Sequence, residues 1–254
     1  MEASRTPLLD YFRRGEAPVD IRLLAARGVL APRAYEQLEL LRLLVKDADS
    51  DVAAAAEATL QSIPVEALSA FLARSDVSSE LRAFFAERGV AIAPAPAGDD
   101  DSPLVDAAPE PELAPAGEDA QSTLQRITSM TVAQRIGVAM KGSREERAIL
   151  IRDPNKIVAV AVLSSPKMTE NEIEGVAKMA SISEEVLRII ANNRAWTKRY
   201  SIIVALARNP KTPVAISMNL LGRLSERDLR AISTDKNVPE ALRITARQKI
   251  VLNR

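Results

Sequence analysis

The residues best suited to chemistry lie around the single tryptophan of the chain. Trp196 is followed within four positions by two cations and a tyrosine, namely Lys198, Arg199 and Tyr200. An aromatic ring among cations can stack on a nucleobase or on an aromatic side chain of a partner. The structural alternative is that Trp196 fills a gap between packed helices while the neighbouring cations extend to solvent. The sequence leaves both interpretations open.

Arginines recur at three- and four-residue spacing, which is the spacing of neighbours on one helix face. The predicted stripes are Arg223, Arg227 and Arg230; Arg243 and Arg247; and Lys141, Arg144 and Arg147. Each stripe by itself is typical of a solvated helix face. Together they indicate a basic surface, so we predict that the first two stripes and the four residues around Trp196 bind a partner.

Motifs for catalysis or metal binding are missing from the sequence. The 254 residues include no His and no Cys, so the commonest metal ligand, the usual acid–base side chain and all thiolate chemistry are excluded. No GxGxxG or GxxxxGK[ST] loop occurs, and "MKGSREE" at 140 is interpreted as a capped turn. "DADSD" at 47–51 lacks the Gly and the distal Glu of a calcium loop. We therefore predict that the protein is not an enzyme and has no cofactor, metal site or small-molecule substrate.

The charge is distributed unevenly along a chain that is neutral overall. The net charge is −3 over residues 1–91, −8 over 92–122 and +11 over 123–254. The middle part is rich in Pro, Ala and acidic residues and cannot bury enough surface to offset its ordering entropy, so 92–121 is predicted to be a disordered linker. The alternative is that it folds back onto the basic part. The excess of +11 predicts a partner with an acidic surface.

The hydrophobic pattern is helical from end to end. Ala and Leu dominate, aromatic residues make up only 3%, and no stretch is convincing as a strand. Apolar spacing predicts five or six helices in 1–91 and eight or nine after 122. Capping boxes are predicted at Ser143 and Thr169, and a shorter imitation of one, with Asp228 in place of Glu, at Ser225. The predicted fold is all-α, with HEAT-like α-solenoid domains at 1–91 and 122–254 joined by the acidic linker.

A short corner sequence recurs five times in the C-terminal part. The five copies are "LIRDPNKI" at 150, "LSSPKMTE" at 163, "IANNRAWT" at 190, "LARNPKTP" at 206 and "ISTDKNVP" at 232. In most of them Asn or Asp closes one helix before Pro or Thr opens the next. The spacing of the copies predicts a repeat of 40 to 43 residues, which is typical of helical solenoids whose units bury their apolar faces by stacking.

Two of these corners carry a family resemblance. "VALARNPKTPVAISMNLLGRL" followed by "AISTDKNVPEALRITAR" resembles the leucine-rich repeat variant family, bacterial helical arrays related in shape to HEAT repeats. The resemblance covers about 150–254; residues 1–91 resemble only a generic HEAT-like unit, best in "VKDADSDVAAAAEATLQSI". It implies a curved helical array with a binding surface. The iron–sulfur cluster of some members is not carried over, because this chain has no Cys.

These features predict a non-enzymatic scaffold or adaptor that binds macromolecular partners, above all proteins, through its helical-repeat surfaces. The alternative is nucleic-acid or ribosome binding through residues 122–254. A DNA-modifying enzyme is a more distant alternative for which no catalytic residue can be named. No apolar run is long enough to span a membrane, and the first residues lack the pattern of a signal peptide, so the predicted location is the cytoplasm.

Overall fold

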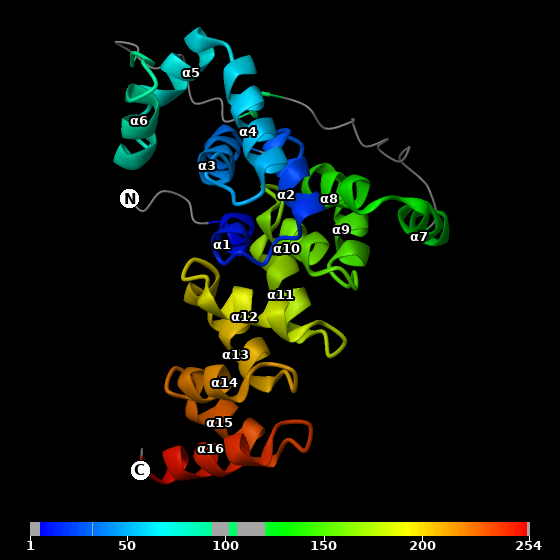
Figure 1. The fold of residues 1–254 in the computed structure, drawn as a ribbon. Helices are drawn as coiled ribbons and strands as arrows, with labels where there is room; N and C mark the ends of the chain where they lie inside the picture. Colours follow the sequence, from blue (N-terminus) through cyan, green and yellow to red (C-terminus); the bar gives the residue numbers. More distant parts are fainter. Residues whose placement is uncertain (1–5, 32, 93–101, 106–119, 253–254) are drawn as a thin grey trace. The chain divides into compact units, whose positions relative to one another are not determined.

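The protein is all-helical in the computed structural model, which describes residues 6–31, 33–92, 102–105 and 120–252. Within these ranges the chain forms sixteen α-helices, one short 3-10 helix and no strand. Figure 1 shows the arrangement of the helices. The predicted all-α class is therefore confirmed. No helix in the same ranges is both long enough and apolar enough to cross a bilayer.

The contacts between residues divide the chain into two compact units, Met1–Lys167 and Met168–Arg254. The first unit contains α1 (Pro7–Arg13), α2 (Val19–Ala26), α3 (Ala34–Leu44), α4 (Ser50–Ser62), α5 (Val65–Leu72), α6 (Ser79–Ala86), α7 (Ala120–Ser129), α8 (Val132–Lys141), α9 (Arg144–Leu150) and α10 (Lys156–Ser164). The second unit contains α11 (Glu170–Lys178), α12 (Glu184–Asn192), the 3-10 helix η1 (Trp196–Lys198), α13 (Tyr200–Arg208), α14 (Val214–Leu221), α15 (Glu226–Thr234) and α16 (Glu240–Leu252). The six helices before residue 92 match the predicted number, and the ten after it exceed the prediction by one.

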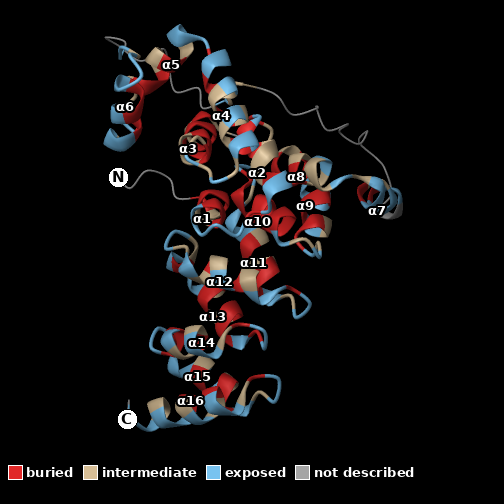
Figure 2. Cartoon of the chain, in the orientation of Figure 1, coloured by how far each residue is buried: buried red, intermediate tan, exposed pale blue. Residues whose placement is uncertain are grey.

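Helix α10 forms part of the core of the first unit. Its sequence "IVAVAVLS" has no polar face, and every residue from Ile157 to Ser164 is buried, as the colouring in Figure 2 shows. A helix that is apolar all round must be covered on every side, and α1, α8 and α9 all pack against it. The Oγ of Ser164 accepts a hydrogen bond of 3.0 Å from the main-chain N–H of Leu8, at the start of α1.

The first unit therefore joins helices from both sides of the predicted linker. The boundary between the compact units lies at 167/168, not within 92–121. Most of that linker, residues 93–101 and 106–119, lies outside the described residues, and α7 already begins at Ala120. The separate domains 1–91 and 122–254 stay a prediction.

The six α-helices of the second unit form three pairs of consecutive helices: α11 with α12, α13 with α14, and α15 with α16. Each pair packs against the next. Helix α11 packs against α13, α14 packs against α16, and α15 packs against α16. The first helices of successive pairs begin at Glu170, Tyr200 and Glu226, which are 30 and 26 residues apart. The predicted period of 40 to 43 residues is therefore wrong. Some of the recurring corners join the two helices of a pair, as at 206 and 232, and others join one pair to the next, as at 190. Their spacing therefore mixes two kinds of connection.

The corners themselves share one hydrogen-bonding pattern. In each of the five, a side-chain oxygen near the end of a helix accepts the main-chain N–H two residues later, at distances from 2.8 to 3.3 Å. The accepting residues are Asp153, Ser165, Asn193, Asn209 and Asp235. This local turn is the one that Asn, Asp and Ser favour, and it reverses the chain without a positive φ. The interpretation of these sequences as helix-joining turns is confirmed.

The two predicted capping boxes, those beginning at Ser143 and Thr169, are present in full. The Ser143 hydroxyl accepts from the N–H of Glu146, and the Glu146 carboxylate accepts from the N–H of Ser143 at 2.5 Å. Two of the N–H groups at "MKGSREE" are thus occupied within the chain, that of Ser143 by the Glu146 carboxylate and that of Glu146 by the Ser143 hydroxyl. The interpretation as a capped turn is confirmed.

Candidate functional site

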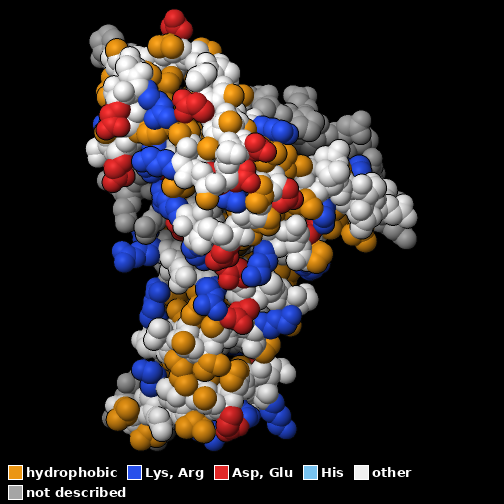
Figure 3. Space-filling view, in the orientation of Figure 1, with side chains coloured by type: hydrophobic (Ala, Val, Ile, Leu, Met, Phe, Trp, Pro, Cys, Tyr) orange, Lys and Arg blue, Asp and Glu red, His pale blue; other side chains and the backbone are white. Residues whose placement is uncertain are grey.

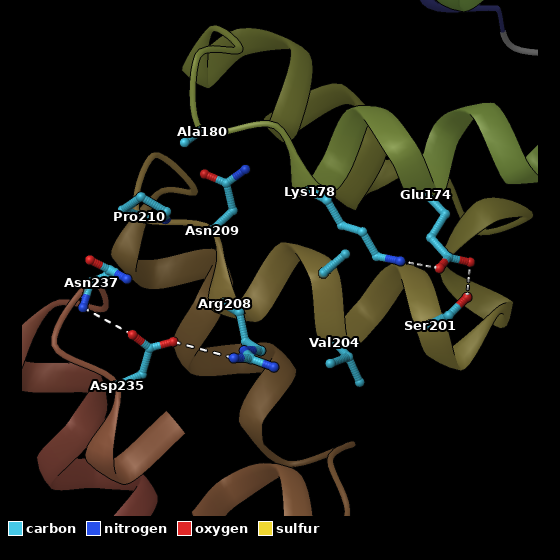
Figure 4. Close-up of a pocket in the computed structure, with 11 residues that line it drawn as sticks. Glu174, Lys178, Ala180, Ser201, Val204, Arg208, Asn209, Pro210, Asp235 and Asn237 are labelled. Atoms are coloured by element: carbon cyan, nitrogen blue, oxygen red, sulfur yellow. Dashed lines mark hydrogen bonds and ion pairs between the residues drawn. The ribbon is translucent and has the colours of Figure 1, made fainter. Parts of the chain in front are cut away.

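A groove of about 730 Å³ lies within the second unit, along α11 and α13 and the corners that follow α13 and α15. Its lining residues fall into three groups: Glu174 and Lys178 with Ala180 beyond the end of α11; Ser201, Val204, Ala205 and Arg208 on α13; and Asn209, Pro210, Asp235 and Asn237 in the two corners. Figure 4 shows these side chains converging from separate elements. The groove is thus built from parts of three successive helical pairs.

The groove is hollow because the helix face beneath it carries small side chains. The α13 residues that line it recur at three- and four-residue spacing, so they share one face of the helix. Between the polar ends of this face lie only Val204 and Ala205, and Ala180 and Pro210 are the other apolar lining residues. No side chain longer than valine fills the middle of the face, which leaves an apolar floor.

At one end of the groove, Glu174 holds two neighbours. Its carboxylate pairs with Lys178 Nζ at 2.5 Å and accepts a hydrogen bond of 2.5 Å from Ser201 Oγ. The hydrogen bonds from Lys178 and Ser201 hold the pKa of the Glu174 carboxyl below its usual value. A carboxylate so stabilised is a weak proton acceptor, so Glu174 is poorly suited to activate the Ser201 hydroxyl.

At the other end, Arg208 pairs with Asp235 at 3.6 Å. In both pairs the cation faces solvent more than the acid does: 62% of the Lys178 side chain is exposed against 22% for Glu174, and 49% of Arg208 against 18% for Asp235. The groove therefore presents positive charge outward. Ser201 and Arg208 are seven residues apart on α13, which separates the two charged ends by about 10 Å along the helix axis.

Asn209 fixes the corner that closes the groove. Its side chain is only 5% exposed and donates to the carbonyl oxygens of Ala177 at 2.8 Å and Met179 at 3.0 Å. These carbonyls lie at the C-terminal end of α11, where a helix leaves acceptors unpaired. The Asn209 Oδ1 at the same time accepts the N–H of Lys211 at 3.0 Å. One buried amide thus joins the turn after α13 to the end of α11.

The predicted site around Trp196 lies elsewhere in the second unit, at η1 and the start of α13. Trp196 is half-buried, and Lys198, Arg199 and Tyr200 are exposed. The Tyr200 hydroxyl donates to an oxygen of Asp228 and accepts the main-chain N–H of Ser225 at 2.8 Å. Hydrogen bonds from Tyr200 and Ser225 lower the pKa of the Asp228 carboxyl.

Tyr200 thereby completes the cap of α15. Ser225 accepts from the N–H of Asp228 as predicted, but the shorter Asp side chain makes no return bond to the Ser225 N–H among the hydrogen bonds of the described residues. The hydroxyl of Tyr200 takes that N–H instead. The predicted imitation of a capping box at Ser225 thus makes only one of the two bonds, and a tyrosine from the preceding helical pair supplies the other acceptor.

The structure brings part of the predicted basic surface together. Arg223 donates to the carbonyl oxygen of Thr197 at 2.5 Å, and Tyr200 contacts the cap of α15, so residues 196–200 lie beside 223–228. We call Lys198, Arg199, Arg223 and Arg227 the basic edge. Arg199 within it is already paired with Glu170 at 3.0 Å.

Two of the predicted stripes are wrong as single helix faces. Arg223 precedes the Ser225 cap and so lies outside α15, which carries only Arg227 and Arg230. Lys141 ends α8 whereas Arg144 begins α9. Arg147 is buried and donates to the carbonyl oxygens of residues 142 and 167, at 3.0 and 3.3 Å. Spacing alone missed the turns that interrupt these runs.

The remaining predicted residues belong to α15 and α16 and have partners within the chain. Arg230 pairs with Glu226 at 2.5 Å, and Arg243 pairs with Glu240. Arg247 lies on the same helix as Arg243, as predicted, and donates to the carbonyl oxygen of Ser233 at 3.2 Å. On the face drawn in Figure 3, cations and anions are interleaved, and no broad basic area is seen there.

Sequence reasoning did not identify the groove residues. The available signal was the face of small side chains at Ser201, Val204 and Ala205, just before the corner "LARNPKTP" that begins at 206. That face becomes a groove only when α11 and the corner after α15 are placed beside it. The described residues contain no cluster of acidic side chains that could hold a metal ion.

Comparison with protein-family models, with curated proteins and with solved structures finds no match to this chain. The resemblance to leucine-rich repeat variants and HEAT-like repeats therefore stays a prediction. The helical pairs of the second unit fit an α-solenoid-like fold in general terms.

Proposed function

We propose that the protein is a non-enzymatic scaffold or adaptor, and that the groove of the second unit binds an acidic peptide segment of a partner protein. The observation that carries this proposal is the pair of outward-facing cations, Lys178 and Arg208, at the two ends of an apolar floor. An extended peptide advances about 3.3 Å per residue, so about three residues span the 10 Å between the charged ends. A segment with an apolar centre and acidic flanks complements this arrangement.

Several features favour recognition over catalysis. The one hydroxyl group among the lining side chains, that of Ser201, is hydrogen-bonded to a carboxylate with a lowered pKa. Lys178 and Arg208 each pair with a carboxylate, and this pairing orients the two cations. Neither pair includes an activated nucleophile. A groove with an apolar floor and a few placed polar groups is the common form of a ligand site.

The test is selection of peptides from a random phage-displayed library by the full chain. Enrichment of sequences with acidic residues on both sides of an apolar centre is expected. Their binding is expected to fall at least tenfold with Lys178→Glu and Arg208→Glu together. The same charge reversal at Lys198 and Arg227 on the basic edge is the matched control and is expected to leave peptide binding unchanged. Selection without acidic preference, or equal losses in both double variants, would contradict the proposal.

A second candidate, nucleic-acid binding, draws support from the basic edge and from the net charge of the second unit. That unit carries 15 Lys and Arg against 9 Asp and Glu, a net charge of +6. Some cations of this candidate surface, Arg199, Arg230 and Arg243, already pair with carboxylates. Phosphates would have to replace these partners, just as an acidic peptide would have to replace those of Lys178 and Arg208.

The same two double variants test this candidate, with the opposite expected outcome. The assay is the electrophoretic shift of duplex DNA and of structured RNA by the full chain. Lys198→Glu with Arg227→Glu is expected to weaken the shift, and Lys178→Glu with Arg208→Glu is expected to leave it unchanged. If about six phosphates are neutralised, a plot of log affinity against log salt concentration is expected to have a slope of about −5. No shift at low salt would remove nucleic acid as a partner.

A further inference from the structure

A buried glutamine in the first unit holds a separate piece of the chain by its backbone. The Oε1 of Gln37 accepts the main-chain N–H groups of Leu104 at 2.8 Å and Val105 at 3.0 Å. Its Nε2 donates to the carbonyl oxygen of Val105 at 2.6 Å. Gln37 is 1% exposed. Leu104 lies 67 residues further along the sequence, so this is a long-range contact.

Residues on or next to three helices surround this amide. Gln37 lies on α3, Gly28 follows α2, and Thr59 lies on α4. The Cγ2 methyl of Thr59 would lie 3.6 Å from a Cβ at position 28. Gly28 has a φ of +81°, and a Cβ there would lie 3.3 Å from Gln37 Nε2 and 3.6 Å from a methyl carbon of Val105. Glycine at this position therefore leaves room for the Gln37 amide and the bound valine. Gln37 Nε2 also contacts the Gly28 carbonyl oxygen at 3.4 Å, which orients the amide toward the segment.

The chemistry of the site specifies what it can bind. All three hydrogen bonds between Gln37 and the segment involve main-chain groups of the segment, so the amide recognises a backbone conformation. The chain bends at Leu104 and Val105, and the bend points two successive N–H groups at one oxygen. Pro103 directly precedes this bend. The described part of the segment has an exposed Ser102 and half-buried residues at 103–105. The matching ligand is a short segment that bends after a proline and carries aliphatic side chains at the bend.

We infer that Gln37 and Gly28 form a peptide-binding site that residues 102–105 occupy in cis, and that a bent aliphatic segment of a partner protein can take their place. The occupant is held by three hydrogen bonds to one side chain, of which Gln37 accepts two and donates one. It is only half-buried, so a peptide with the same backbone pattern can make the same contacts. The internal segment has the advantage of its tether, equivalent to an effective concentration on the order of millimolar. This site is independent of the groove in the second unit and adds a second point of attachment to the chain.

The experiment removes the internal occupant and supplies a peptide in its place. Leu104→Pro with Val105→Pro deletes both N–H groups that Gln37 accepts, whereas Leu104→Ala with Val105→Ala keeps them and is the matched control. The probe is a fluorescein-labelled synthetic peptide of sequence GSPLVG, followed by fluorescence anisotropy with the full chain. We expect the proline variant to bind the probe at least tenfold more tightly than the unchanged chain, and the control to resemble the unchanged chain more closely.

A second probe keeps the inference falsifiable without a further change in the protein. A GSPLVG peptide methylated on the leucine and valine nitrogens lacks the two N–H groups and is expected to lose at least tenfold in affinity for the proline variant. Lys178→Glu with Arg208→Glu is expected to leave probe binding unchanged, which separates this site from the proposed groove. No binding to the proline variant, equal binding to the unchanged chain, or equal binding of the methylated probe would overturn the inference.

Discussion

Asn209 offers the sharpest test of how the helical pairs are held together. Its buried side chain makes three hydrogen bonds: two donated to the end of α11 and one accepted from the N–H of Lys211. Each such bond contributes about 0.5–1.5 kcal/mol net. Asn209→Ala is therefore expected to lower the free energy of unfolding of the second unit by about 2–4 kcal/mol.

Asn209→Asp tests the donor role alone. The introduced carboxylate keeps the bond from Lys211 but faces the carbonyl oxygens of Ala177 and Met179, which disfavour its charged form. Its folded pKa should then lie above the unfolded value of about 3.9. The stability that the protonated side chain gives the Asn209→Asp variant is thus fully present below about pH 4, and it is lost as the pH rises through the folded pKa. The variant is expected to be clearly destabilised at pH 7 and to recover relative to the unchanged chain near pH 4.

Asn193 is the matched control, because it forms the same kind of corner. Its Oδ1 accepts the N–H groups of Ala195 at 2.9 Å and Trp196 at 3.3 Å. No hydrogen bond from its amide nitrogen is found in the part of the chain that the structure describes. Asn193→Asp is expected to stay within about 1 kcal/mol of the unchanged chain at pH 7, since both acceptor bonds survive.

The assay is urea unfolding of the full chain at pH 7 and pH 4, followed by the fluorescence of Trp196. As the only tryptophan, it reports on the second unit. Two outcomes would contradict this role of Asn209. One is that Asn209→Asp and Asn193→Asp lower the free energy of unfolding equally, and the other is that the loss at Asn209 does not depend on pH. Either would show that the hydrogen bonds donated to the end of α11 do not hold the two helical pairs together.

Three further predictions concern other contacts, each measured by urea or thermal unfolding. Gly137→Ala is expected to stabilise by about 0.4–1 kcal/mol, because position 137 lies inside α8 and a new Cβ there would meet no atom within 4 Å beyond its chain neighbours and the backbone of its own helix. Gly142→Ala is expected to cost about 2–3 kcal/mol, because its Cβ would lie 2.5 Å from a backbone carbonyl oxygen. Equal effects of the two substitutions would refute this contrast. Ser164→Ala is expected to cost about 1–3 kcal/mol through the N–H left unpaired at the start of α1, and an unchanged midpoint would argue against that packing. Tyr200→Phe is expected to cost about 0.5–1 kcal/mol at pH 7. Because Tyr200 depresses the pKa of Asp228, the stability it supplies exists above the unfolded pKa of about 3.9 and is lost as the pH falls, so the difference should shrink at pH 3.5; a constant difference would contradict this linkage.

The sequence predicted the local features of this protein well. The boxes at Ser143 and Thr169 and all five corner turns are formed as expected, because each depends on hydrogen bonds between residues two or three positions apart. The predictions failed where spacing was extended across a turn. The stripe from Arg223 to Arg230 is interrupted by the Ser225 cap, and the period of 40 to 43 residues combined two kinds of corner.

By itself, then, the amino-acid sequence determined the helix starts at the Ser143 and Thr169 boxes, the turns at the five corners, and which chemistry is absent from the side chains. Only the tertiary structure decided that α1 packs on α10, that Gln37 binds the backbone at 104–105, and that small side chains on α13 become the floor of a groove. The physical reason is range. Caps and turns are satisfied within a few residues, whereas a buried amide or an apolar helix face is satisfied by whichever distant segment packs against it.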